Sequence, residues 1–431
     1  MEKIILRHVD LCVQLKKGRT VREGIMQYRN ACQHDHVRSL EDVVKHLLDA
    51  ASAKAEEARS ATSETLEGVD DLDVTATPEN LMLSYVMQEE TRDRADREHV
   101  APWFKFLWEA YRSMLEILRN NARLEGLYAG VANRALAFCL QYRRSTEFRR
   151  LCDILRNHLK NLDTPQRRMP RADLPDLTKS DTSRRYLQTR FEQLRVASEL
   201  SMWQEAFRSV EDIFNLIAIS QKGGGRPPRP ELMATYYLRM TQIFRMSYSA
   251  SMAGSLLYLG FAWFKLYSLY AIHLRTLSAE DEATLASAVV LSAVAVLPFD
   301  RLLETRSADS QTDQDRMVRM ANLLGVPHER HDVASVLCRE ALLREVRRLG
   351  LLNKVPAEIR RIFELVEDTF DPLEKCRASR SVAGELVGGA LAPPLCAAPA
   401  PASVQHHAPP PRAAPAPAPS PACVRAALLA R

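Results

Sequence analysis

The sequence predicts an all-α protein, built as an irregular right-handed array of stacked helical hairpins. Three observations support this fold class. Apolar residues recur three or four positions apart over most of the chain, as they do on one face of a helix. Glycine is scarce, with 15 among 431 residues, whereas strand-rich folds need more glycine in their turns. No segment alternates apolar and polar residues convincingly enough to predict a strand.

A first helix is expected at the N-terminus. Ile4, Ile5, Cys12 and Leu15 repeat at helical spacing, and Gly18 is the expected stop. This helix has no helical partner before it. Its hairpin mate is therefore expected either to be missing or to come from another chain.

The second expected helix starts near Ser39. Ser39 and Asp42 have the spacing of a capping box, and Glu41 and Lys45 that of an i,i+4 ion pair. An acidic stretch follows, and the pair Thr77-Pro78 then predicts an N-cap with proline at the first helical position.

The strongest periodic segment runs from Pro102 to about Leu118. Its apolar face comprises Trp103, Leu107, Tyr111, Met114 and Leu118. Neighbouring aromatic residues, including Phe104, Phe106 and Trp108, widen this face, and we expect most of them to pack between stacked hairpins. Two further helices are predicted, at about 127–142 and 146–162.

Prolines and polar residues predict a linker or surface loop over residues 163–185. The helical pattern resumes over 191–217 and is broken by a glycine- and proline-rich run after Lys222. Later helices are predicted at about 232–244, 252–274, 279–297, 313–324, 334–349 and 357–370, with Ser278 and Asp281 as another capping box. A hairpin thus takes about 40 residues, in the range of TPR-like and HEAT-like solenoids.

The predicted organisation has four segments. Helical repeats occupy residues 1–162, the linker or surface loop 163–185, a second helical-repeat segment 186–376, and an Ala/Pro-rich tail 377–431. Residues 393–431 contain 11 prolines and no acidic residue. Such a composition cannot bury enough apolar surface to offset its ordering entropy, so the tail is expected to be disordered.

Composition excludes some classes of protein. The formal net charge is only +5, from 59 basic and 54 acidic residues, which permits RNA contact without arguing for it.

The eight cysteines include no Cys-x-x-Cys pair and predict free thiols in a reducing compartment. The N-terminus has no basic region followed by an apolar run, so a secretory signal is not expected and the cytoplasm is the predicted location.

The motif search predicts no enzyme. The His34-Asp35-His36 triplet lacks the third and fourth ligands that a zinc site needs. The Gly223-Gly224-Gly225 run has no following Lys-Ser/Thr pair and is not a phosphate loop. No nucleophile, base and orienting residue come together, so we expect neither a cofactor nor a small-molecule substrate.

The segment 250–274 is apolar enough to raise the question of a membrane span. Lys265 lies near its centre, and a charged residue there costs about 2.5–3.5 kcal/mol on insertion scales. A buried hairpin helix is therefore the favoured prediction, and a membrane-associated helical protein is the alternative.

One basic cluster could bind RNA phosphates. Its members are Arg143, Arg144, Arg149, Arg150, Arg156 and Lys160. The residues at 149, 156 and 160 are spaced to share one helix face. The alternative is a solvated face balanced by acids on the same helix, such as Glu147 and Asp153.

Several strings resemble a known family, that of the largest subunit of eukaryotic translation initiation factor 3. The main strings are Pro102-Trp103-Phe104-Lys105-Phe106-Leu107-Trp108-Glu109, Phe138-Cys139-Leu140-Gln141-Tyr142, Glu147-Phe148-Arg149-Arg150-Leu151-Cys152 and Trp203-Gln204-Glu205-Ala206-Phe207-Arg208-Ser209-Val210-Glu211-Asp212-Ile213. Supporting strings include Ser39-Leu40-Glu41-Asp42-Val43-Val44 and Arg319-Met320-Ala321-Asn322-Leu323-Leu324-Gly325. The resemblance covers about residues 1–376.

The resemblance implies a function. It implies helical repeats leading toward a winged-helix PCI module, in a non-catalytic, RNA-binding scaffold of the initiation factor. The implied partners are the sister subunits of the factor, especially B and C, the small ribosomal subunit, and mRNA or rRNA. Another PCI-type assembly, such as the proteasome lid, is an alternative of the same architecture.

The sequence departs from the family at both ends. The likeness stops after Phe370-Asp371-Pro372-Leu373, where the Ala/Pro tail replaces the rest of the module, and several dozen residues that the family has before Met1 are expected to be missing. The chain is therefore expected to be a truncated form, and pairing through a winged helix is in doubt.

Overall fold

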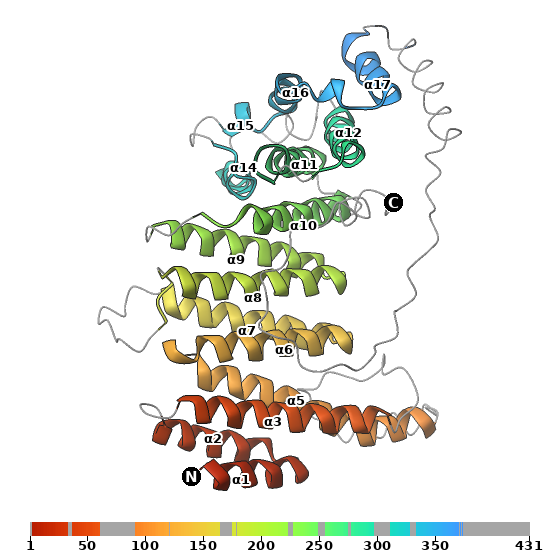
Figure 1. Cartoon of the computed structure of the whole chain (residues 1–431). Coiled ribbons are helices and arrows are strands. Elements are labelled where there is room, and N and C mark those ends of the chain that lie inside the picture. Colours follow the sequence, from red (N-terminus) through yellow and green to blue (C-terminus); the bar gives the residue numbers. More distant parts are fainter. Residues whose placement is uncertain are drawn as a thin grey trace. The chain divides into compact units, whose positions relative to one another are not determined.

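The computed structural model describes residues 2–32, 37–60, 91–119, 121–163, 175–177, 179–222, 227–248, 255–274, 277–296, 311–327, 333–369, 371 and 373. Within these ranges every regular element is a helix (Figure 1), which confirms the predicted all-α helical-repeat class. Contacts divide the chain into two compact units, Met1–Pro227 and Pro228–Arg431. The four-segment organisation stays a prediction, and its tail lies outside the described residues.

Unit 1 is a stack of helices joined in chain order. They are α1 (Glu2–Gln14), α2 (Gly18–Cys32), α3 (Val37–Ser60), α5 (Thr91–Leu118), the short 3-10 helix η1 (Ala122–Leu124), α6 (Glu125–Gln141), α7 (Ser145–Asp163), α8 (Ser180–Glu199) and α9 (Trp203–Lys222). Among the described elements, each helix packs mainly on those one or two places away in the chain, such as α1 on α2 and α3, or α8 on α6 and α9. This is how stacked hairpins build a continuous core.

Three hairpins of unit 1 close through turns of three residues, at 15–17, 142–144 and 200–202. The middle residue of each turn has a left-handed backbone, with φ of 55° at Lys16, 49° at Arg143 and 57° at Ser201. In the first turn the Lys17 N–H donates to the Cys12 carbonyl at 3.0 Å, and the Lys16 N–H to that of Val13 at 3.1 Å. This Schellman pattern recurs in the other two turns and satisfies the last carbonyls of each helix.

The prediction that Gly18 stops the first helix is wrong. Lys16 takes the left-handed position, and Gly18 is the first residue of α2. Gly18 instead leaves room for the carboxylate of Glu109 on α5: a Cβ at 18 would lie 2.4 Å from its Oε2, and this flexible side chain would have to shift.

One helix was not expected from the sequence, and two expected boundaries are corrected. Helix α2 was not predicted, although its buried residues Val21, Ile25, Tyr28 and Cys32 recur at helical spacing. The pattern expected over 191–217 is two helices, because a three-residue turn at 200–202 interrupts it without disturbing the apolar period. Helix α8 also begins at Ser180, inside the predicted linker.

Two helices begin earlier than the sequence pattern indicated. Helix α3 begins at Val37, so Ser39 lies inside it, and its Oγ is 2.5 Å from the phenolic oxygen of Tyr28. Helix α5 begins at Thr91 and continues through Pro102, which gives up one backbone hydrogen bond. The ion pair of Glu41 and Lys45 is confirmed at 3.7 Å. The expected cap at 77–78 lies outside the described residues.

Unit 2 contains the later helices. They are α10 (Pro230–Tyr248), α11 (Ser255–Leu269), a π-helical turn η2 (Tyr270–Leu274), α12 (Ala279–Ala295), α14 (Gln311–Leu323), α15 (Val333–Val336), α16 (Arg339–Arg348), the 3-10 helix η3 (Leu351–Asn353) and α17 (Ala357–Asp368). The Ser278 cap is confirmed, since its Oγ accepts the Asp281 N–H at 3.2 Å.

Helix α11 is buried between α10 and α12, as predicted for the apolar segment. Its Lys265 donates from Nζ to the carbonyl of Gly325 at 2.9 Å, within unit 2. Burial lowers the pKa of Lys265. Among the described helices, none is both long enough and apolar enough to cross a membrane.

The apolar face predicted on α5 forms much of the unit 1 core. Leu107, Tyr111, Met114 and Leu118 are buried, whereas Trp103 is half-buried beneath Lys16, whose Nζ lies 4.5 Å from the ring centroid. The wider aromatic set packs against α6, with ring centroids 4.5 Å apart for Phe104–Tyr142 and 5.7 Å for Phe104–Phe138. These aromatic residues are core residues, as expected.

Replacing Ser201 by glycine is expected to stabilise the protein by about 1 kcal/mol, because a left-handed backbone disfavours residues with a Cβ. As a control, Gln204→Gly on the exposed face of α9 is expected to destabilise by roughly 0.5–1 kcal/mol. Denaturant unfolding of both variants tests the turn geometry. A change in the free energy of unfolding with the same sign in both variants would contradict it.

Candidate interaction surface

Helix α7 and the turn before it carry the six basic residues predicted as RNA contacts. The structure places them in different environments. Arg143, Arg149 and Lys160 are exposed, Arg150 is half-buried, and Arg144 and Arg156 make ion pairs inside the unit. The spacing of these residues in the sequence did not separate the two groups. It predicts which residues share a helix face, but not which residues of other helices pack against that face.

Arg144 forms a buried pair with Glu147. Its Nε and one terminal nitrogen donate to the two carboxylate oxygens at 3.1 and 2.7 Å, and the side chains are 8% and 1% exposed. Arg144 also lies at the N-cap of α7, where its carbonyl accepts the Phe148 N–H at 3.0 Å. The pair therefore locks the turn between α6 and α7.

Arg156 lies among three carboxylates. It donates to Asp153 on its own helix at 2.8 Å, and to Asp212 and Glu205 on α9 at 3.1 and 3.4 Å. Burial alone would lower the pKa of Arg156, but Asp212 and Glu205 raise it above its usual value, so the guanidinium stays charged. This side chain joins α7 to α9.

A second buried arginine extends the same network into α8. Arg190 is 3% exposed and donates to the Leu155 carbonyl at 2.8 Å and to Gln193 Oε1 at 2.7 Å. Gln193 in turn donates to Ser209 on α9 at 2.9 Å. Sequence reasoning missed Arg190, although Leu187 and Leu194, three positions before it and four after it, are buried apolar neighbours on the same helix face.

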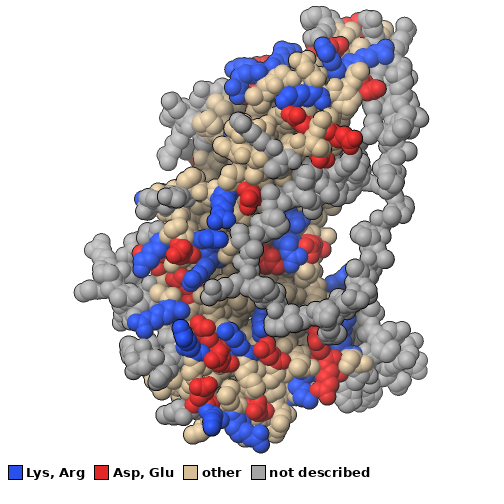
Figure 2. Space-filling view, viewed as in Figure 1, with Lys and Arg blue, Asp and Glu red and all other residues tan. Residues whose placement is uncertain are grey.

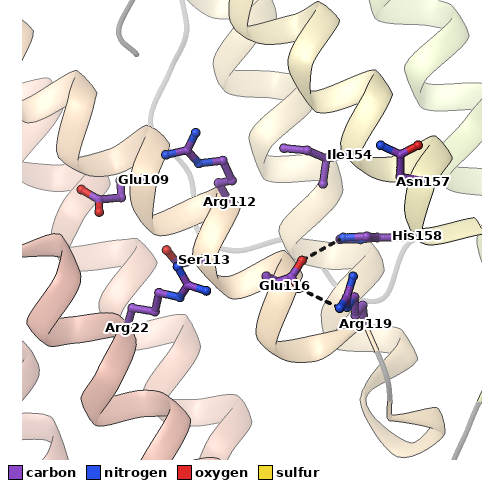
Figure 3. A pocket seen from close by; sticks show the side chains of 9 residues that line it. All are labelled: Arg22, Glu109, Arg112, Ser113, Glu116, Arg119, Ile154, Asn157 and His158. Carbon is purple, nitrogen blue, oxygen red and sulfur yellow. Dashed lines mark hydrogen bonds and ion pairs between the residues drawn. The ribbon is translucent and has the colours of Figure 1, made fainter. Parts of the chain in front are cut away.

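A polar cleft opens between α2, α5 and α7 (Figure 3). Its volume is about 390 Å³, and its lining residues are Arg22, Glu109, Arg112, Ser113, Glu116, Arg119, Ile154, Asn157 and His158. A second, shallower groove shares Arg112 and Ile154 and adds Arg150 and Asp153. Both hollows are lined by residues of α5 and α7, and the groove includes Arg150 of the predicted basic cluster.

His158 lines the cleft beside Glu116 and Arg119 (Figure 3). Its Nδ1 is 3.0 Å from the Tyr128 hydroxyl, its Nε2 is 3.2 Å from Glu116, and Glu116 also pairs with Arg119 at 2.9 Å. Burial raises the pKa of Tyr128, so this phenol is protonated and donates to Nδ1. The neutral ring then donates from Nε2 to Glu116.

This arrangement ties α7 to α5 and α6. Both ring nitrogens of His158 are bonded within the unit, and burial lowers its pKa although Glu116 opposes the shift. Within the described ranges no group of His, Cys, Asp or Glu side chains could hold a metal ion. His34-Asp35-His36 and Gly223-Gly224-Gly225 lie outside those ranges.

The visible face of unit 1 is mixed in charge. Figure 2 shows basic and acidic side chains interspersed along it, without a large patch of one sign.

Comparison with known proteins identifies the family. The family described as "eIF3a, PCI domain, TPR-like region" matches residues 1–374. This chain belongs to that family. The resemblance found in the sequence strings is thereby confirmed, together with the helical-repeat architecture that it implied.

Curated relatives of this eIF3a family are long proteins, named as the A subunit of eukaryotic translation initiation factor 3. The relative from Arabidopsis thaliana is 47% identical over 378 residues, which are 87% of this chain and 37% of the relative. The relative from Nicotiana tabacum is 44% identical over 399 residues, or 91% and 40%. That from Mycosarcoma maydis is 43% identical over 388 residues, or 87% and 36%. The chain thus spans well under half the length of these relatives.

Arg144→Ala is expected to lower the free energy of unfolding by about 3–5 kcal/mol, because it leaves the Glu147 carboxylate buried without its guanidinium partner. Arg149→Ala, on the exposed face of α7, is the matched control and is expected to change stability by no more than about 0.5 kcal/mol. Guanidinium unfolding followed by helical circular dichroism measures both. Similar small losses in the two variants would contradict a structural role for the pair.

Stability is expected to fall below neutral pH through His158. Because burial lowers the pKa of His158 in the folded state, the unfolded chain binds the proton more readily as the pH drops through about 6.5. The free energy of unfolding is therefore expected to decrease between about pH 7 and pH 5, and less steeply in His158→Gln. Thermal unfolding across this range compares the two proteins, and identical slopes would refute the assignment.

Proposed function

We propose that this chain acts as a non-catalytic scaffold segment of the A subunit of eukaryotic translation initiation factor 3. In this proposal it helps to recruit mRNA and to assemble the pre-initiation complex on the small ribosomal subunit. The single observation that carries the proposal is the match of residues 1–374 to the family, because it covers the described fold of both units.

The fold supports a scaffold role. Stacked hairpins expose a long surface along which several partners can bind at once, and the proposed partners are sister subunits, especially B and C, the small ribosomal subunit, and mRNA or rRNA. At the cleft, His158 on α7 joins Tyr128 on α6 and Glu116 on α5. Binding, rather than bond-making chemistry, is what this geometry favours.

The exposed basic residues of the α6–α7 hairpin are the proposed RNA contacts. Arg143, Arg149 and Lys160 are solvent-exposed, and Arg150 borders the groove shared with Arg112. Arg144 and Arg156 act instead through Glu147 and through the acids of α9. We propose that only the exposed group meets phosphates.

Cytoplasmic location is part of the same proposal. The five cysteines in the described ranges are free thiols, and four of them, Cys12, Cys32, Cys139 and Cys152, are buried. Burial raises the pKa of Cys139 and Cys152, which keeps both as unreactive thiols. These features fit a reducing compartment.

Affinity capture of the full chain from eukaryotic lysate tests the assembly. The expected result is recovery of initiation factor 3 subunits together with proteins of the small ribosomal particle, measured by mass spectrometry against an unrelated helical-repeat bait. Recovery of proteasome lid proteins in their place would contradict the proposal and favour the other PCI-type assembly.

The double variant Arg149→Ala/Lys160→Ala is expected to weaken RNA binding about equally for all sequences and to reduce the dependence of log K on log salt by about 1–2. Lys45→Ala/Lys54→Ala on α3, also exposed, is the charge-matched control. Fluorescence anisotropy with a labelled single-stranded RNA, titrated at several salt concentrations, measures the effect. Equal weakening by both double variants would show that only net charge matters.

A further inference from the structure

All the cationic side chains that line the polar cleft of unit 1 are arginines. Arg22 comes from α2, Arg112 from α5, and Arg119 from the position that follows α5 (Figure 3). Arg22 and Arg112 are exposed, and Arg119 is half-buried. The planar guanidinium fork matches the oxygens of a phosphate or carboxylate group with two parallel hydrogen bonds, which a lysine ammonium cannot do. We call these three residues the cleft arginines.

The two acids in the same lining have positive neighbours of their own. Glu116 is bonded to Nε2 of His158 at 3.2 Å and pairs with Arg119 at 2.9 Å. Glu109 lies at the first turn of α2, where backbone N–H groups and the helix dipole favour negative charge. Figure 3 shows its carboxylate directed away from the other side chains drawn. Among the described residues, no acid pairs with Arg22.

Arg119 retains a donor without an acceptor. Its guanidinium pairs with Glu116, yet its Nε is buried and has no hydrogen-bond partner among the described groups. Buried donors without partners are uncommon in native structures, because each has given up its hydrogen bonds to water. An anion in the cleft would offer this guanidinium a second acceptor. Ser113 and Asn157 add a hydroxyl and an amide as neutral donors in the same lining.

The shape of the site suits one anionic group carried on a longer chain. The cleft volume of about 390 Å³ lies at the small end of the range for ligand sites. The shallower groove adjoins it, since the two share Arg112 and Ile154. A ligand whose charged group enters the cleft can therefore extend along the groove, where Ile154 offers an apolar contact.

The lining argues against a nucleic-acid backbone as this ligand. Across both hollows, four arginines alternate with three acids, Glu109, Glu116 and Asp153. A nucleic acid carries one charge per nucleotide, so its successive phosphates would meet these acids. Among the lining residues the one ring is that of His158, which is buried and bonded to Tyr128 and Glu116 rather than open to a base.

We propose that the cleft binds a phosphorylated serine or threonine of a partner protein. In this arrangement Arg22 and Arg112 donate to the phosphate oxygens, and the peptide continues along the groove beside Ile154. A phosphate monoester carries about −1.5 to −2 charges at neutral pH and three strong acceptor oxygens, so it engages more of the cleft arginines than a carboxylate does. This inference does not rest on the proposed role in translation, because it follows from the lining of the cleft alone.

The test uses the full chain and three pools of synthetic nonapeptides. The pools have phosphoserine, serine or glutamate fixed at the centre and mixed residues elsewhere. The immobilised chain is expected to retain the phosphoserine pool at least tenfold better than the serine pool, and better than the glutamate pool, as measured by quantitative mass spectrometry. The best-retained phosphopeptide, labelled with fluorescein, then gives affinities by anisotropy.

Three double variants locate the binding. Arg22→Gln/Arg112→Gln is expected to lose at least tenfold in affinity for the phosphopeptide. Lys45→Gln/Lys54→Gln on α3 removes the same charge from exposed positions and is expected to keep the wild-type affinity. Arg22→Lys/Arg112→Lys keeps the charge but loses the fork, and a loss of at least threefold is expected. Because all four side chains are exposed, thermal unfolding of the variants is expected to match the wild type.

Several outcomes would overturn the proposal. Equal retention of the phosphoserine and serine pools would exclude recognition of the phosphate, and unchanged affinity in Arg22→Gln/Arg112→Gln would place the peptide elsewhere. Inorganic phosphate that competes as well as the phosphopeptide at equal concentration would identify a site for a small ion. Single-stranded RNA that displaces the peptide, and whose own binding is lost in the same variant, would assign the cleft to nucleic acid.

Discussion

The arrangement of unit 1 depends on how its hairpins reverse direction. Three turns of three residues are centred on Lys16, Arg143 and Ser201, and each of these residues has a left-handed backbone. In each turn two N–H groups donate hydrogen bonds to carbonyls of the preceding helix. Because so short a turn leaves little freedom, the second helix must lie antiparallel beside the first. The faces that become core, and those that remain at the surface, follow from this reversal.

Ion pairs and hydrogen bonds of charged side chains fix the positions of neighbouring helices of unit 1 relative to one another. Arg156 and Arg190 reach from α7 and α8 to acceptors on neighbouring helices, and Asp212 on α9 lies within 3.1 Å of the first and 3.8 Å of the second. Buried charges contribute less to net stability than to specifying one packing arrangement, since any misplaced helix would leave them without partners. Part of the basic composition of the chain therefore serves its interior, and the count of basic residues overstates how many a nucleic acid would meet.

Much of this fold could be predicted from apolar periodicity. The faces of α5 and α11 and the Ser278 cap follow from spacing rules that local sequence obeys. The left-handed positions could not be predicted in the same way, because lysine, arginine and serine occupy them in place of glycine and tertiary packing overrides local preference. The buried ion pair of Arg144 could not be predicted either, because a basic residue in a helical pattern does not indicate which acidic residue lies next to it.

The packing of each helix on its chain neighbours has a consequence for how the protein is made. Where contacts join elements one or two places apart, little loop-closure entropy must be overcome before a new hairpin gains stability. The hydrogen bond from Arg29 to the Ile117 carbonyl spans 88 residues, yet both partners lie within unit 1. Unit 1 can therefore assemble hairpin by hairpin as the chain leaves the ribosome, well before the residues of unit 2 have been synthesised.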